Sequence, residues 1–236
     1  MQPAVRLGFN SVKSFNLEAA TRLVAARKQR PFTDVEDLGR RAALTTLEVE
    51  ALAAADTLST LAGHRRKARW ETASHRLQID LMQTASIEEA KPEIPFATEG
   101  REIVDDYAST GFTLRRHPLA LLRPRLRKMS LSSAEELHDM PNGKLVRTTG
   151  IVTVRQRPGT AKGTIFVSLE DETGVINVIV WSHIIEKQRR PLLSASLLTV
   201  HGTWQRQGEV RHVVASRLFD HSRFLGRLRL ESRDFH

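Results

Sequence analysis

The chain has 236 residues, with 36 Lys and Arg against 27 Asp and Glu, nine His and no Cys. This length predicts one large or two small domains, and a hydrophobic fraction of 40% excludes wholesale disorder. The absence of Cys excludes disulfides, thiolate zinc sites and Cys nucleophiles, and it fits a reducing, cytoplasmic compartment. The apolar runs are shorter than the ~18 residues that crossing a bilayer requires, so no membrane partner is expected.

The positive charge is distributed unevenly. Residues 1–100 carry 14 basic and 13 acidic groups, whereas residues 144–220 carry 11 and 6. Six further basic residues fall between Arg115 and Lys128 with no acid among them. A net charge of +9 favours a polyanion such as DNA as partner, although a solvated basic face would give the same excess. A functional surface is therefore sought in the second half of the chain.

Residues 1–84 have the pattern of short helices. Leu17, Ala20, Leu23 and Val24 predict an apolar face on a helix that Pro31 ends. Capping boxes are predicted at Thr33–Glu36 and Thr45–Glu48, and a basic helix follows Gly63. Helices this short are unstable alone, so they are expected to pack as a small bundle.

Residues 85–143 are predicted to form a linker and a helical connector. Prolines mark the linker near residues 91–95, and a helix is predicted over Glu102–Ser109. A further capping box is predicted at Ser132–Glu135, before a turn at Pro141–Gly143.

From residue 144 the hydrophobic pattern changes to the period of strands. One helix, Ser182–Arg190, is predicted between the third and fourth of five strands, which is the order of an OB-fold barrel. The predicted fold is therefore α+β, with a helical bundle, a linker, a five-stranded OB-fold β-barrel at 144–220 and a basic tail at 221–236. The five predicted strands are Leu145–Val154, Thr164–Leu169, Val175–Trp181, Ser196–Trp204 and Val210–Ala215.

The connection between the first two strands is the strongest candidate for a binding site. Arg155, Arg157 and Lys162 share it with Gly159 and Gly163, and no acid interrupts them. Guanidinium and ammonium groups meet phosphates, and glycines let a backbone approach a ligand closely. This pattern predicts DNA binding, and a solvated basic hairpin without a ligand is the alternative.

Aromatic residues lie near this loop in the predicted barrel. Phe166 and Trp181 belong to strands 2 and 3, and Trp204 stands beside Arg206 in the connection between strands 4 and 5. Each ring could stack on a base, and each could instead belong to the core.

The chain shows no pattern for catalysis. The acidic stretch Glu170–Gly174 is expected to be a surface turn, because a two-metal centre needs carboxylates that converge from separate strands. His117, before Pro118, is expected to be a structural turn residue. We therefore predict no catalytic residue, no metal ligand and no cofactor in this chain.

Several segments resemble one known family. The barrel segments resemble the OB domain of bacterial error-prone DNA polymerases, the C-family paralogues of the DNA polymerase III alpha subunit. The beginning of the chain resembles the tandem helix-hairpin-helix region of the same family. The segments that carry the resemblance are Val152–Gly163, Leu169–Gly174, Asn177–Trp181, Thr110–Leu114, His117–Leu119, Val5–Gly8 and Val12–Lys13.

The resemblance implies the C-terminal region of such a polymerase. The catalytic palm and the Mg that it holds would lie outside this chain, which would not be an enzyme on its own. The implied role is to bind single-stranded or primer-template DNA during translesion synthesis, damage-induced mutagenesis and repair, in the cytoplasm at the nucleoid. The implied partners are an inactive Y-family-like protein and a small accessory protein, with the sliding clamp reached through them.

Three positions depart from the family pattern. Ser14 and Asn16 follow Lys13 where the family hairpin, Lys-Gly-hydrophobic-Gly, has its glycines, and Asp56 replaces a glycine further along the chain. These replacements predict that the barrel, rather than the hairpins, carries most of the DNA affinity. The alternatives are a protein-interaction module, in which the tail Arg223–His236 docks a mutagenesis partner, and a remnant without activity.

Overall fold

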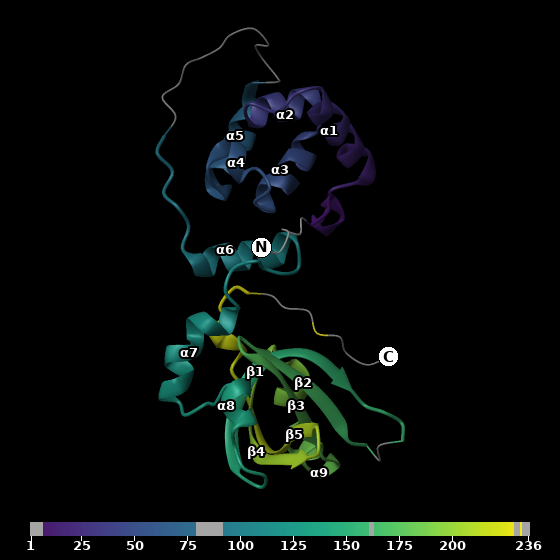
Figure 1. Ribbon diagram of the computed structural model, residues 1–236, viewed down its shortest axis with the longest axis vertical. Helices are drawn as coiled ribbons and strands as arrows, with labels where there is room; N and C mark the ends of the chain where they lie inside the picture. Colours follow the sequence, from purple (N-terminus) through teal and green to yellow (C-terminus); the bar gives the residue numbers. More distant parts are fainter. Residues whose placement is uncertain (1–6, 79–91, 161–162, 229–231, 233–236) are drawn as a thin grey trace. The chain divides into compact units, whose positions relative to one another are not determined.

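The computed structural model describes residues 7–78, 92–160, 163–228 and 232, with backbone only for 74–78 (Figure 1). The chain forms two compact units, residues 1–113 and residues 114–236. No helix in these described ranges is long and apolar enough to cross a membrane.

The first unit is helical. Its core consists mainly of small and aliphatic side chains from several helices, among them Ala19, Leu23, Val49 and Leu52. The α-helices in its described residues are α1 (Leu17–Gln29), α2 (Val35–Arg41), α3 (Thr46–Ala54), α4 (Ser59–Ala62), α5 (Arg65–Gln78) and α6 (Glu99–Ser109), after a short 3-10 helix at Phe9–Ser11.

Polar caps set where these helices begin. The predicted Thr45–Glu48 capping box is confirmed, since the backbone N–H of each residue donates to the side chain of the other. The predicted Thr33–Glu36 box is wrong by one residue. Asp34 caps α2 by accepting from the Asp37 N–H at 2.8 Å, because an aspartate carboxylate is the stronger acceptor next to the first turn.

The apolar face predicted for α1 is partly wrong. Leu23 is buried as predicted, but Leu17 is 83% exposed at the start of the helix, and Ala19 and Ala26 complete the buried face. These three positions follow the i, i+4, i+7 spacing of one helix face.

The predicted connector, residues 85–143, contributes to both units. In the first unit, Arg65 at the start of α5 donates to the carbonyl of Glu102 at 3.0 Å and pairs with the Asp106 carboxylate, which fixes α6. His64 and Arg66 contact the carbonyls of Ile94 and Pro95. Residues from Leu114 onward belong to the second unit.

The second unit is a closed five-stranded barrel with strand order β1-β2-β3-β5-β4 (Figure 1). All neighbouring strands are antiparallel except β3 and β5. This arrangement confirms the predicted OB-fold. The strands are β1 (Leu145–Gln156), β2 (Ile165–Asp171), β3 (Gly174–Val180), β4 (Leu197–Gln207) and β5 (Val210–Asp220).

Short helices surround the barrel. The predicted helix Ser182–Arg190 is two helices, α9 (Ser182–Lys187) and α10 (Arg189–Ser194), which place Ile184 and Leu192 in the barrel core. Before the barrel lie α7 (Pro118–Lys128) and α8 (Ala134–His138). The capping box of α8 is Ser133 with Glu136, one residue later than predicted.

Candidate nucleic-acid interface

The outer face of β2 and β3 exposes aromatic side chains. Along β2, Ile165 and Val167 point into the core, so Phe166 between them points outward and is 38% exposed. Phe166 lies opposite Ile179 on β3. Two residues after Ile179, Trp181 is 47% exposed and lies on the same face by the alternation of an extended chain. The structure therefore brings Phe166 and Trp181 together as diagonal neighbours.

Two loops adjoin these strands and carry exposed cations. Arg157 and Gly159 are exposed in the β1–β2 loop, and Gly163 has a φ of +83°, which a glycine adopts readily. Arg206 is exposed at the end of β4, next to the β4–β5 turn. Lys162, also predicted to bind DNA, lies outside the described residues.

Arg155 does not lie on this surface. It is 3% exposed and donates to the carbonyls of Leu192 and Ala195 and to Ser232 Oγ. The cause is an irregularity between Val152 and Val154 that changes the alternation of β1, so that Arg155 lies opposite the inward-pointing Val167. Its guanidinium holds the end of α10 to the barrel, which corrects the DNA-binding role predicted for it.

Trp204 is also a core residue. It is 2% exposed and packs in the barrel cluster with Val200 and Val213. Leu198, Val200, Gly202 and Trp204 share the inner face of β4. The predicted base-stacking role of Trp204 is therefore wrong, because its ring is not accessible to a base.

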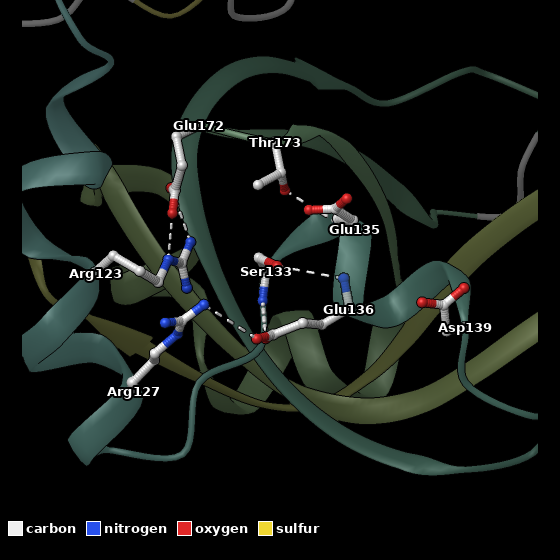
Figure 2. Close-up of a pocket in the computed structure, with 8 residues that line it drawn as sticks. All are labelled: Arg123, Arg127, Ser133, Glu135, Glu136, Asp139, Glu172 and Thr173. Atoms are coloured by element: carbon white, nitrogen blue, oxygen red, sulfur yellow. Dashed lines mark hydrogen bonds and ion pairs between the residues drawn. The ribbon is translucent and has the colours of Figure 1, made fainter.

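The basic run before the barrel is engaged in contacts within the unit. Arg123 pairs with Glu172 (Figure 2). It also pairs with Asp171 at 3.1 Å, and the two ion pairs join α7 to the β2–β3 turn. Arg127 lies 3.7 Å from the Glu136 carboxylate. Burial would raise the pKa of Glu172, but the hydrogen bond and charge of Arg123 outweigh it and hold that pKa below its ordinary value.

The acidic turn has a structural role. Asp171 Oδ1 accepts from the N–H groups of Thr173 and Gly174, and Oδ2 accepts from the first N–H of α8 at Ala134. His117 caps α7 by accepting from the Leu119 N–H, as expected of a structural residue. Burial lowers its pKa, against the opposing charges of the turn carboxylates. Within the described ranges, no three His, Asp or Glu side chains form a metal-binding group.

Two hairpin residues of the first unit adopt the left-handed backbone conformation that glycine favours, although neither is glycine. Ser14 has a φ of +64° and Asp56 a φ of +59°, both in the left-handed region. The Lys13 N–H donates to the Ser109 carbonyl at 2.9 Å, and its ammonium donates to the Tyr107 carbonyl. Contacts within the unit therefore already engage Lys13.

The tail packs on its own unit. Leu225 and Leu228 are buried, and the ring of Phe224 lies 3.8 Å from the guanidinium carbon of Arg125. Leu230, a further apolar residue of the predicted docking tail, lies outside the described residues. The apolar side chains described in this segment are thus occupied within the chain.

Sequence reasoning missed a second group of exposed residues, on the outer face of β1, β4 and β5. Arg147, His201, Arg217 and Phe219 are distant in sequence and meet only through the register of the strands. The period-2 pattern of each strand alone marks them as outward-facing, but it does not show that they are neighbours.

The fold defines a chain with a helical unit and an OB-fold barrel. The family described as "Helix-hairpin-helix motif" matches residues 1–68, and the family described as "OB-fold nucleic acid binding domain" matches residues 142–220.

Over its whole length the chain is similar to error-prone DNA polymerases. It is 52% identical over 235 residues to that of Alkalilimnicola ehrlichii and 52% identical over 241 residues to that of Ralstonia pickettii. The matches cover 100% of this chain but only 23% and 22% of those proteins. The chain therefore belongs with the helix-hairpin-helix and OB-fold region of error-prone DNA polymerases, and it spans less than a quarter of their length.

Proposed function

We propose that this chain is a non-catalytic DNA-binding region of a translesion polymerase, and that the outer β2–β3 face of its barrel binds the single-stranded template. The observation that carries this proposal is the exposure of Phe166 and Trp181 on one face, between loops that present Arg157 and Arg206. The family matches support nucleic acid as the ligand class.

The chemistry of this face suits an unpaired strand. An aromatic ring stacks on any base, and each stack contributes about 1–3 kcal/mol. Neither Arg157 nor Arg206 has a carboxylate within ion-pair distance in the described part of the chain, so both guanidinium groups are available to phosphates. Stacking and phosphate contacts together give affinity without sequence preference, which a template strand requires.

The same proposal assigns the polymerisation chemistry, and its Mg²⁺, to parts of the polymerase outside this chain. The carboxylates of the β2–β3 turn hold Arg123 and the start of α8, so they serve the fold. The chain corresponds to less than a quarter of the relatives, which supports a role as one binding part of a larger enzyme. The place of that enzyme in damage-induced mutagenesis, and its protein partners, belong to this proposal.

Docking of a partner protein through the tail receives no support from the described side chains. Leu225 and Leu228 are buried and Phe224 is half-buried, so little apolar surface is left for a partner in this segment. We therefore retain DNA binding as the single proposed function.

Fluorescence anisotropy with a labelled oligothymidylate tests the proposal. We expect the chain to bind at low salt, and the double variant Phe166→Leu/Trp181→Leu to lose at least tenfold in affinity, because leucine keeps apolar bulk but cannot stack. Phe96→Leu, which changes a 77% exposed ring in the helical unit, is the matched control and should bind as the parent does.

Two results would contradict this function. One is an absence of binding by the parent chain at low salt. The other is an unchanged affinity of the β2–β3 double variant while its melting temperature equals that of the parent.

A further inference from the structure

The outer face of β1, β4 and β5 carries a cross-strand row of basic side chains. Arg147 on β1 lies opposite His201 on β4, which lies opposite Arg217 on β5. Their sequence neighbours Val200 and Leu218 are buried in the core, so the three point outward. Directly opposite residues share a face and lie about 5 Å apart at Cβ, so this row is a continuous basic surface.

Aromatic rings extend this row along β5. Phe219 is 37% exposed, and its ring centroid lies 4.8 Å from that of His201 and 6.4 Å from that of His221. The rings of His221 and Phe224 are nearly parallel, at 13°, with centroids 4.9 Å apart. We call the surface formed by Arg147, His201, Arg217, Phe219 and His221 the β4–β5 face.

The arginines of this face form no ion pair in the described part of the chain. Arg147 and Arg217 have no carboxylate within ion-pair distance in the described part of the chain. The nearby Asp220 accepts from the Ser222 N–H at 2.9 Å and from two serine hydroxyls, and it makes no ion pair with either arginine. Burial, followed by the charges of Arg147 and Arg217, lowers the pKa of His201. Positive charge gathered on one face would be stabilised by an anionic ligand.

A relay of hydroxyl groups fixes His221 within the stack of rings. Thr149 Oγ1 donates to the Leu198 carbonyl, and Thr199 Oγ1 donates its single proton to Thr149 Oγ1 at 2.9 Å. Thr199 must therefore accept from His221 Nδ1–H, at 2.7 Å. Neutral His221 thus keeps Nε2 as an acceptor, and Nε2 has no partner among the described residues.

We propose that the β4–β5 face is a second binding surface for single-stranded DNA, with a base stacked on Phe219 and phosphates held by Arg147 and Arg217. An exposed aromatic ring next to guanidinium groups is the combination that single strands require. The proposal rests on the proposed function in that the chain binds DNA, but it uses another wall of the barrel, since β4 neighbours neither β2 nor β3.

Oligothymidylate titrations at several salt concentrations test this surface. Arg147→Ala/Arg217→Ala should lower the slope of log K against log salt by about 1.4, since each phosphate contact to a single strand contributes about 0.7. Phe219→Leu keeps the apolar cover over the strand and should weaken binding about tenfold through the lost stack. Arg27→Ala/Lys28→Ala removes the same charge from the exposed end of α1 and is the matched control.

Photocrosslinking gives an independent readout on the parent chain. An oligonucleotide with 5-iodouracil at each position in turn should crosslink to Phe219 or His201, as well as to Phe166 or Trp181. Crosslinks confined to the β2–β3 face would overturn the proposal, because a base stacked on Phe219 would react there.

The outcomes separate the two proposals. If the parent binds DNA and only Phe166→Leu/Trp181→Leu weakens it, the β4–β5 face proposal fails and the proposed function stands. If the parent does not bind, both fail. An unchanged slope in Arg147→Ala/Arg217→Ala, with an unchanged affinity in Phe219→Leu, overturns DNA binding at this face.

Discussion

The helical unit and the barrel use their arginines in different ways. In the helical unit, the single carboxylate of Asp37 lies within 3.4 Å of three arginines, namely Arg30, Arg40 and Arg41. The buried side chain of Arg65 lies among three carboxylates, those of Asp56, Glu102 and Asp106. On the barrel, the exposed Arg147, Arg157, Arg206 and Arg217 have no such carboxylate partner among the described residues.

This difference indicates which cations are available to a polyanion. An arginine paired with a carboxylate must give up that pair before it meets a phosphate, whereas an unpaired exposed arginine gives up only water and counterions. The first 100 residues are nearly neutral in sequence, and several arginines of the helical unit are paired with carboxylates. The comparison therefore favours the barrel as the main source of DNA affinity, and three predictions test it.

The largest expected effect is on the stability of the helical unit. Arg65 is 1% exposed in its side chain and contacts three carboxylates. Arg65→Ala removes the buried guanidinium that faces these carboxylates and should lower the free energy of unfolding by about 3–5 kcal/mol. Thermal melting measures this loss. DNA affinity, measured well below the melting temperature, should stay the same, and a weakened affinity would contradict the comparison.

A smaller loss is expected from the buried arginine of the barrel. Arg155→Met keeps the aliphatic stem but leaves the carbonyls of Leu192 and Ala195 without their donor, which should cost about 2–3 kcal/mol. Chemical denaturation measures this loss of unfolding free energy. For Arg155→Met, the slope of log K for DNA against log salt should equal that of the parent, whereas Arg157→Ala should reduce this slope by about 0.7. Equal slopes in both variants would remove the loop from the DNA contacts.

The smallest expected effect is that of mild acid on the stability of the barrel. Burial, with nearby arginines, lowers the pKa of His201 and His221 below the ordinary 6.5, so the folded barrel binds fewer protons than the unfolded chain. The contribution of these histidines to the free energy of unfolding of the barrel is therefore fully present above pH 6.5. It is lost as the pH drops through 6.5 towards the lowered pKa values of the folded state.

The helical unit should respond at lower pH. Burial alone would raise the pKa of Asp37 and of Glu48, but their hydrogen bonds outweigh it and lower both. The stability from these carboxylates is present above their ordinary values of 3.8 and 4.5 and is lost as the pH falls below them. Hydrogen exchange of peptides from each unit should show the barrel loosening first, and simultaneous loosening between pH 7 and 5 would contradict this order.

The sequence predicted the elements better than the directions of particular side chains. Each of the five strands was predictable, because β-branched and apolar residues alternate between turns. The burial of Trp204 was also accessible, since Leu198, Val200, Gly202 and Trp204 are spaced two apart and so share one face. The predicted stacking role of Trp204 followed from its position next to the β4–β5 connection, and this alternation contradicts it.

Other features could not be predicted in this way. The burial of Arg155 depends on the irregularity in β1, which no local pattern in Val152–Gln156 marks. The β4–β5 face depends on cross-strand register, and β5 has an extra residue, Ser216, opposite the step from His201 to Gly202. Pairing of distant residues is a tertiary property that a single sequence does not contain.

The closure of the barrel limits how another polypeptide can associate with it. A sheet with a free edge can accept an added strand from a partner through backbone hydrogen bonds. The five strands here pair around a complete ring, from β1 through β2, β3 and β5 to β4 and back to β1. A partner protein would therefore have to recognise side chains on the outer walls of the barrel rather than the backbone of an open strand edge.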